Sequence, residues 1–132
     1  MSELDCIFCK IVAGEIPSTK IYEDDTAIGF LDINPVSKGH TLLIPKAHHQ
    51  MMIDTPDELV AKLFVTTKKI LKAIQAATKS HLVGVSVMGD EVPHFHIHLI
   101  PRHADDGLSG WSRGVYIENE KEEIAAEIKK FV

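Results

Sequence analysis

Cysteine and long apolar runs are both scarce in this 132-residue sequence. Its two cysteines, Cys6 and Cys9, are too few for a disulfide scaffold, and no stretch approaches the roughly 20 apolar residues that span a bilayer. The first residues lack the basic start and apolar run of a signal peptide. We therefore expect a cytoplasmic protein that has no membrane partner.

Positive charge is also in deficit, since 14 Lys and Arg residues against 19 Asp and Glu residues give a net charge of −5 at pH 7. No basic surface is expected, and nucleic acid is not a predicted partner. No glycine-rich loop follows an expected strand, which argues against nucleotide binding of the Rossmann or P-loop type. The length suits one domain with a buried core, so a single domain over residues 1–132 is predicted.

The pattern of apolar residues predicts an α+β fold with an antiparallel sheet. Strands are expected over residues 20–23, 26–33, 40–45, 82–88 and 94–100, and Pro101 is expected to end the last one. A short helix is expected over 6–12, ended by Gly14. Strands that are close in sequence and joined by turns favour antiparallel pairing over βαβ units.

Two further helices are expected. The long one begins at Thr55, where Thr55-Pro56-Asp57-Glu58 matches a capping box with proline at the first helical position. The last one is expected over 119–132, with Asn119 as its cap. The side chains expected to face inward are Leu59, Leu63, Ile70, Ile74 and Ala77 in the long helix and Ile124, Ile128 and Phe131 in the last one.

Histidine is the residue in excess, with eight in the chain. In the segment His94-Phe95-His96-Ile97-His98 the histidines alternate with apolar residues, and residues two apart in a strand share a face. Three imidazoles in a row are poor core material, because each brings two polar nitrogens that need partners. Imidazole acts as a nucleophile, an acid or base, and a metal ligand. This pattern alone leaves three interpretations open: a catalytic strand, a three-histidine metal site, or a strand that merely faces solvent.

The same segment, followed by Leu99 and Ile100, resembles the motif of the histidine triad family. Four further blocks, at residues 6–11, 22–24, 30–33 and 39–46, are similar to those of its Hint-like branch and occur in the same order. A lone His-x-His-x-His would be a weak signal, and the four additional blocks make the match specific. The resemblance covers residues 6–103 and leaves 104–132 as a variable tail.

This resemblance implies the HIT-like fold: an antiparallel sheet with one long central helix and a C-terminal helix, usually in a homodimer with a continuous sheet. It also implies an enzyme that hydrolyses or transfers AMP-type groups of nucleoside 5′-phosphoramidates or related nucleotidyl compounds, with a purine nucleotide as substrate. The rival interpretations are a dinucleoside polyphosphate hydrolase of the Fhit-like branch and a nucleotide-binding regulator whose catalysis is vestigial.

By position in the motif, His96 would attack the α-phosphorus and form a nucleotidyl-histidine intermediate that water then hydrolyses. His98 would bind the phosphate and help to protonate the leaving group, and His40 would help to orient His96. The nucleotide would also be held by Asp32 at the ribose hydroxyls, Ile33 at the base and the backbone N–H of Gly89 at the phosphate. Neighbouring donors can stabilise the charge that develops on phosphate oxygens, so no catalytic metal is required.

The segment before the triad departs from the family pattern. Hint-like members usually have an asparagine, a glycine turn and a Gly-Gln-Ser/Thr sequence there, whereas here the hairpin is shorter. The usual Gln and Ser positions fall near Asp90 and Glu91. Two ionised carboxylates pointing into a phosphate site would repel the phosphate, so this segment bears on the leaving group and the rate.

The pair Cys6 and Cys9 has three interpretations: a zinc site completed by two histidines, a redox couple, or two small core residues. The βαβ setting of a redox couple is missing. A subset of histidine triad proteins looks like this chain and implies one closed, structural zinc, here held by Cys6, Cys9, His48 and His94, with His49 as a fallback ligand. Such a site would leave His96 free. His81 and His103 are expected at the surface, and Trp111 is open between core, substrate cover and dimer contact.

Overall fold

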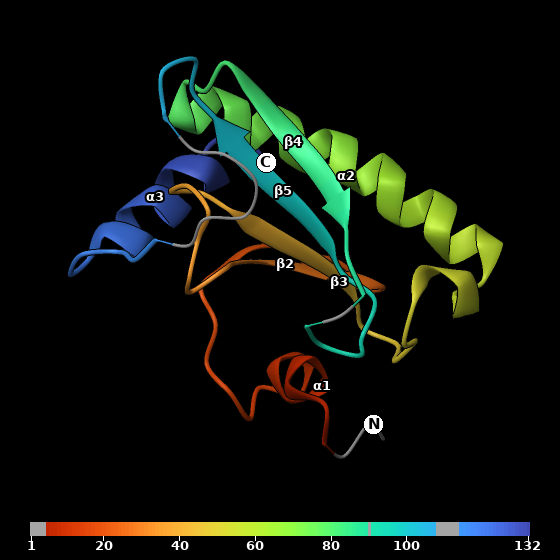
Figure 1. Cartoon of the computed structure of the whole chain (residues 1–132). Helices are drawn as coiled ribbons and strands as arrows, with labels where there is room; N and C mark the ends of the chain where they lie inside the picture. Colours follow the sequence, from red (N-terminus) through yellow and green to blue (C-terminus); the bar gives the residue numbers. More distant parts are fainter. Residues whose placement is uncertain (1–4, 90, 108–113) are drawn as a thin grey trace.

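Five strands form one antiparallel sheet in the computed structural model, which describes residues 5–89, 91–107 and 114–132 (Figure 1). The strand order is β1-β2-β3-β5-β4, and the predicted α+β class is confirmed. The strands are β1 (Lys20–Glu23), β2 (Ala27–Leu31), β3 (Thr41–Pro45), β4 (Leu82–Val87) and β5 (Ile97–Arg102). The helices are α1 (Ile7–Val12), a 3₁₀ turn (Met52–Asp54), α2 (Asp57–Thr78) and α3 (Glu120–Lys129). None of the helices in these described ranges is long and apolar enough to cross a membrane.

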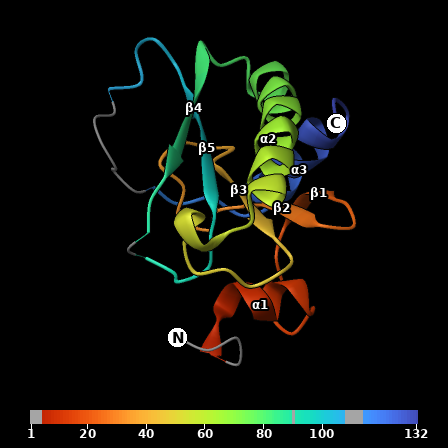
Figure 2. The same cartoon turned by 90° about the vertical axis from the view of Figure 1, so that its right-hand side faces the viewer.

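The two faces of the sheet are covered by different helices. Helices α2 and α3 lie on the same side of the sheet, and α1 lies apart from them at the lower end of the molecule (Figure 2). The predicted inward residues Leu63, Ile70, Ile74 and Ile128 are buried in the core of the first face, together with Phe95, Ile97 and Leu99. On the second face, Phe8 and Ile11 of α1 pack with alternate strand residues that include Phe30 and Leu42. The odd-numbered residues around β5 therefore serve the main core, and the intervening histidines lie on the face of α1.

Strand β5 begins three residues later than predicted and ends two residues later. Its pairing with β3 begins at Ile97, opposite Leu43, so His94 and His96 precede the strand. The preceding segment is held by other bonds instead, because the N–H of Phe95 donates to the carbonyl of His49 at 2.7 Å. Pro101 does not end the strand. It lies beyond Leu99, the last β3 partner, where β5 has a neighbour on one side only and proline is tolerated.

The predicted capping box at Thr55 is wrong, whereas Asn119 is the N-cap of α3 as predicted. The N-cap of α2 is Pro56, which has no polar side chain, and the Thr55 hydroxyl donates to the carbonyl of Met51 at 2.9 Å. The side chain of Asn119 makes no capping hydrogen bond to α3, and the carboxylate of Glu120 accepts from the N–H of Ile117 at 3.0 Å. The prediction that Phe131 faces inward also fails, since it is 53% exposed beyond the end of α3.

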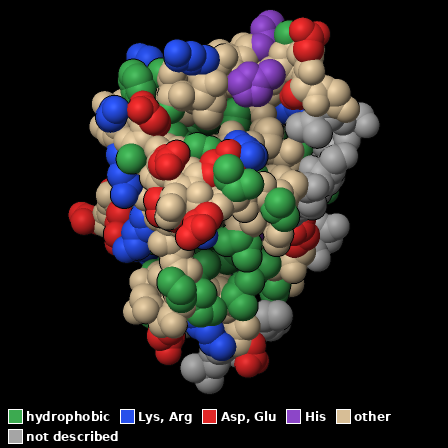
Figure 3. All heavy atoms as spheres, turned by 90° about the vertical axis from the view of Figure 1, so that its left-hand side faces the viewer, with side chains coloured by type: hydrophobic (Ala, Val, Ile, Leu, Met, Phe, Trp, Pro, Cys, Tyr) green, Lys and Arg blue, Asp and Glu red, His purple; other side chains and the backbone are tan. Residues whose placement is uncertain are grey.

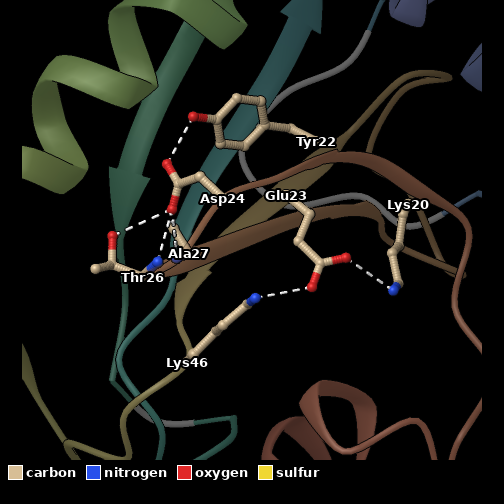
Figure 4. Close-up of polar contacts among 7 residues, drawn as sticks. All are labelled: Lys20, Tyr22, Glu23, Asp24, Thr26, Ala27 and Lys46. Atoms are coloured by element: carbon tan, nitrogen blue, oxygen red, sulfur yellow. Dashed lines mark hydrogen bonds and ion pairs between the residues drawn. The ribbon is translucent and has the colours of Figure 1, made fainter.

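Asp24 closes the turn between β1 and β2 (Figure 4). One of its carboxylate oxygens accepts from the N–H groups of Thr26 at 2.8 Å and Ala27 at 2.9 Å, and the other accepts from the hydroxyl of Tyr22 at 2.6 Å. Partial burial acts to raise the pKa of Asp24, but these hydrogen bonds outweigh it and lower the pKa to about 2. Asp24 therefore stays ionised and fixes the hairpin that carries Asp32 at its far end.

Gly39, directly before His40, has a backbone conformation that disfavours a side chain. Its φ is +101°, and a Cβ there would come within 3.0 Å of Thr78 Cγ2 and 3.2 Å of Pro101 Cγ. We expect Gly39→Ala to lower the free energy of unfolding by about 1–3 kcal/mol, as measured by chemical denaturation. Gly14→Ala is the matched control, because Gly14 has φ +79° but nothing within 4 Å of its Cβ position. Equal losses in the two variants would contradict the steric argument.

Candidate functional site

The three histidines of the triad segment are all buried, with exposed fractions of 0% for His94, 2% for His96 and 1% for His98. The predicted alternation is confirmed, because Phe95, Ile97 and Leu99 point into the opposite core. Buried imidazoles need hydrogen-bond partners. The partners of these rings determine which nitrogen of each carries the hydrogen.

His96 is held by the backbone of its own segment. Its Nδ1 lies 2.7 Å from the carbonyl oxygen of His94, and a carbonyl can only accept, so the hydrogen of His96 is on Nδ1. In the neutral ring, Nε2 then keeps its lone pair. The Phe8 and His96 rings form a T-shaped pair, with the ring centroids 5.2 Å apart and the planes at 84°. His96 is thus oriented and has a free nucleophilic nitrogen.

In His98 the hydrogen and the lone pair lie on the opposite nitrogens from those in His96. The N–H of Val36 donates to Nδ1 of His40 at 3.0 Å, so the hydrogen of His40 is on Nε2. That nitrogen lies 2.9 Å from Nδ1 of His98, which must accept and leave the hydrogen of His98 on Nε2. Asp32 lies at the start of this chain of contacts, with Oδ2 3.7 Å from His40 Nε2.

The prediction that His40 orients His96 differs from this geometry. The hydrogen bond of His40 is made to His98, and the nitrogen of His96 that needs an acceptor is held by the His94 carbonyl. The cause is the register of the sheet, in which Leu42 is opposite His98, so that His40 comes from the segment next to His98. His40 is connected to His96 through the His98 ring, whose centroid is 4.9 Å from that of His96.

Cys6, Cys9, His48 and His94 converge at the start of α1, and their four ligand atoms lie within 4.8 Å of one another. Sγ of Cys6 is 3.3 Å from Nδ1 of His94, and Sγ of Cys9 is 3.2 Å from Nδ1 of His48. Around a tetrahedral zinc, bond lengths of about 2.3 Å to sulfur and 2.0–2.1 Å to nitrogen place sulfur and nitrogen about 3.5 Å apart. These donors and separations fit zinc, and the fallback His49 is not in the cluster.

The protonation of His94 also fits a metal ligand. Its Nε2 donates to the carbonyl of Pro45 at 2.8 Å, which leaves the lone pair on Nδ1, the nitrogen that faces the two thiols. Burial lowers the pKa of His94 to about 4, so the ring is neutral at physiological pH, as a metal ligand must be. A backbone carbonyl behind a ligating imidazole is the usual arrangement in zinc sites.

A pocket of about 480 Å³ opens beside α1. Its wall is mostly apolar and includes Ile7, Phe8 and Ile11 from α1, and its polar groups include Asp32. Ile33 also lines it and is 68% exposed. Figure 3 shows hydrophobic side chains gathered on the lower half of one face, toward the end of the molecule where α1 lies. Such a pocket, with few polar groups, is typical of a small-molecule site.

Three residues named from the sequence are not placed in this pocket. Gly89 is exposed next to Met51 and is not among the residues that line it. Asp90 and Trp111 lie outside the described residues. Sequence reasoning in turn missed Phe8, which contacts the His94 and His96 rings and lines the pocket. Its place between the two cysteines was the available signal.

The fold and the triad geometry agree with the comparisons to known proteins. The HIT domain matches residues 13–105, and the chain belongs to this family. It is 41% identical to an adenosine 5′-monophosphoramidase of Schizosaccharomyces pombe, over 96% of this chain and 100% of that protein. A HIT-like protein from Bartonella henselae superposes with a TM-score of 0.90 at 31% identity, covering 100% of this chain and 98% of its own. A zinc-bound histidine triad protein from Mycobacterium smegmatis superposes with a TM-score of 0.85 at 32% identity, covering 98% of this chain and 96% of its own.

Proposed function

We propose that this protein hydrolyses nucleoside 5′-phosphoramidates of the AMP type, with His96 as nucleophile. The observation that carries the proposal is the opposite polarity of two neighbouring rings, with a lone pair on Nε2 of His96 and a hydrogen on Nε2 of His98. A nucleophile beside a fixed donor is the arrangement that acyl or phosphoryl transfer needs. The activity named for the yeast relative supports the same reaction class.

In the first step, the lone pair of His96 Nε2 attacks the α-phosphorus, and the phosphorus–nitrogen bond of the substrate breaks. The leaving nitrogen takes the electron pair and a proton from Nε2 of His98, so that it departs as an amine. The positive charge that the His96 ring gains, because its Nδ1 keeps the hydrogen while Nε2 bonds to phosphorus, balances the charge left on the His98 ring. In the second step, water attacks phosphorus, the bond to His96 breaks, and the proton released by water returns to His98. The products are the nucleoside monophosphate and the amine.

The pocket beside α1 is proposed to hold the nucleoside. Its apolar wall of Ile7, Phe8 and Ile11 suits a purine ring, and the exposed Ile33 borders the base. Asp32 offers carboxylate oxygens to the ribose hydroxyls at the same wall. Through His40, Asp32 is also connected to the His98 donor.

Turnover of two substrates tests this function against its nearest rival. An adenosine 5′-phosphoramidate with a simple amine and a dinucleoside polyphosphate are compared at equal concentration under single-turnover conditions. The proposal expects the phosphoramidate to react faster. Faster cleavage of the polyphosphate would favour the Fhit-like interpretation, and no turnover of either would favour a nucleotide-binding regulator.

We further propose that Cys6, Cys9, His48 and His94 hold one structural zinc ion per chain. Bound there, the metal would tie α1 to the triad segment and supply stability. The double variant Cys6→Ser, Cys9→Ser is expected to lose the metal and several degrees of melting temperature, as followed by elemental analysis and calorimetry. The matched control is His49→Ala, since His49 is adjacent in sequence but outside the cluster. The site would be contradicted if protein that was purified with reduced thiols and without chelators contained no zinc.

A homodimer is proposed through the edge of the sheet at β4. Among the described residues this strand pairs with β5 alone, and it exposes Leu82, Val85 and Val87 by 46%, 40% and 38%. An exposed edge strand presents unpaired backbone N–H and C=O groups and apolar side chains, which a second chain can cover by pairing with it. Light scattering at micromolar concentration is expected to give twice the chain mass, and Val85→Lys is expected to shift the protein toward the monomer. A monomer mass for the unaltered protein would refute this.

A further inference from the structure

The loop between β2 and β3, residues 32–40, carries Asp32 at one end and His40 at the other. Its two ends are joined by a hydrogen bond from the N–H of Asp32 to the carbonyl of His40 at 2.9 Å. Inside the loop, the N–H of Val36 donates to Nδ1 of His40 at 3.0 Å. The orientation of the His40 ring, and of the hydrogen that it donates to His98, therefore depends on the backbone of this loop.

The segment that leads into α3, residues 114–120, lies beside this loop and is attached to it at three points (Figure 1). In the central contact, the Tyr116 hydroxyl accepts from the N–H of Gly39 at 3.0 Å. The Tyr116 ring packs against the main core, so its hydroxyl is held in place. The other two contacts are a hydrogen bond from the N–H of Gly114 to the carbonyl of Pro35 at 2.6 Å and an ion pair of Lys38 with Glu120 at 2.7 Å.

Gly39 depends on this contact because it has no side chain to restrain it. Glycine rotates about its backbone bonds more freely than any other residue, and Gly39 has a φ of +101°. Its carbonyl accepts from the Thr41 hydroxyl at 2.9 Å, which holds the peptide that joins it to His40. Its N–H belongs to the preceding peptide, which is held by Tyr116. The two hydrogen bonds thus hold the two peptide planes whose relative rotation sets the path of the chain into His40.

The Tyr116 hydroxyl remains neutral near physiological pH. Burial raises the pKa of Tyr116 to about 12, and the negative charge of Asp32 acts in the same direction, against the lowering effect of the N–H of Gly39. The contact between Tyr116 and Gly39 should therefore not change with pH in the neutral range.

We propose that Tyr116 is a positioning residue for the proton donor of the site. By holding Gly39, it keeps the Nε2–H of His40 on Nδ1 of His98, and so keeps the hydrogen of His98 on the Nε2 that protonates the leaving nitrogen. Tyr116 is not among the residues that line the pocket, so it acts through the loop. This inference rests on the proposed function and adds a residue to its first step.

Tyr116→Phe tests the inference, because it removes the hydroxyl oxygen and keeps the ring on the core. Departure of an amine requires a proton, whereas departure of 4-nitrophenolate does not. We therefore compare kcat/KM, which covers the steps up to departure of the leaving group, for the propylamide and the 4-nitrophenyl ester of adenosine 5′-monophosphate. In the variant the amide should react about tenfold more slowly, because the donor is misplaced, and the ester should stay within about twofold of the unaltered protein.

A second measurement follows His40 without any turnover. In protein that contains isotope-labelled histidine, the ring N–H signal of His40 is identified by its loss in His40→Ala. Its exchange with water is measured by nuclear magnetic resonance. In Tyr116→Phe this exchange should be at least about twofold faster, as expected when one hydrogen bond that holds the loop is lost.

Tyr22→Phe is the matched control. Tyr22 is the other tyrosine of the chain, also packs against the main core, and its hydroxyl donates to Asp24 at 2.6 Å. This control should lower stability but leave both the ratio of the two substrates and the exchange at His40 unchanged.

The inference requires both the split between the two substrates and the faster exchange at His40. If either is absent in folded Tyr116→Phe, the inference is overturned while the proposed function stands. If the unaltered protein cleaves neither substrate, the proposed function fails, and this inference fails with it.

Discussion

Replacing His96 by alanine is expected to lower kcat by at least about a thousandfold, because it removes the atom that attacks phosphorus. Nucleotide binding should persist, since the pocket wall is formed by other residues. The measurements are single-turnover hydrolysis of an AMP amide and binding of AMP by calorimetry.

The burial of His96 changes the effect that its removal is expected to have on the free energy of unfolding. A side chain facing an open site would cost little to remove, but this ring is 2% exposed and packs against Phe8. Truncation is therefore expected to cost about 1–3 kcal/mol of the free energy of unfolding. His96→Asn is the second variant, because its amide can still donate to the His94 carbonyl while it lacks a nucleophilic nitrogen. Turnover retained by either folded variant, at the level of the exposed control His81→Ala, would rule out His96 as nucleophile.

A covalent intermediate on His96 is the second large expected effect. Rapid quenching of a reaction with substrate labelled at the α-phosphorus should trap label on the protein, and peptide mapping should place it on His96. Two in-line displacements each invert phosphorus, so the configuration should be retained overall. Chelation of magnesium during the assay should change the rate little while the proposed structural zinc stays bound.

Two results would contradict this mechanism, one for His96 and one for His98. Net inversion at phosphorus would mean that water attacks the substrate directly, with His96 acting as a general base. His98→Ala gives a partial test of the donor, because the intermediate should still form but more slowly with a poor leaving amine. Equal loss for good and poor leaving groups would remove His98 from the protonation step.

His94 connects the two candidate sites. Its ring nitrogen faces the thiols of Cys6 and Cys9, while its carbonyl oxygen holds Nδ1 of His96. Phe8, between the two cysteines in α1, packs against both histidine rings. The residue that supplies a candidate metal ligand therefore also supplies the acceptor on which the tautomer of His96 depends.

Most of the elements were predictable because their signals are local. Period-two alternation around Ile97 showed which side chains enter the core, and the apolar stripe of α2 showed its buried face. The helix ends were predicted less well. Caps depend on a few backbone angles, and the hydroxyl of Thr55 found a competing acceptor in Met51. The start of β5 was missed because it depends on the neighbouring strands. β4 ends at Val87, opposite Ile97, and the pairing of β5 with β3 also begins at Ile97.

The sequence by itself determined the chemistry available: three alternating imidazoles, and two thiols spaced to meet on one turn of a helix. Only the tertiary structure decided the tautomers of His94 and His98, since a neutral imidazole takes its tautomer from its partners and theirs come from distant elements. Those partners are the carbonyl of Pro45 for His94, 49 residues away in sequence, and the ring of His40 for His98, 58 residues away. Contacts so distant in sequence depend on strand register, which is fixed only when the strands pair across the sheet.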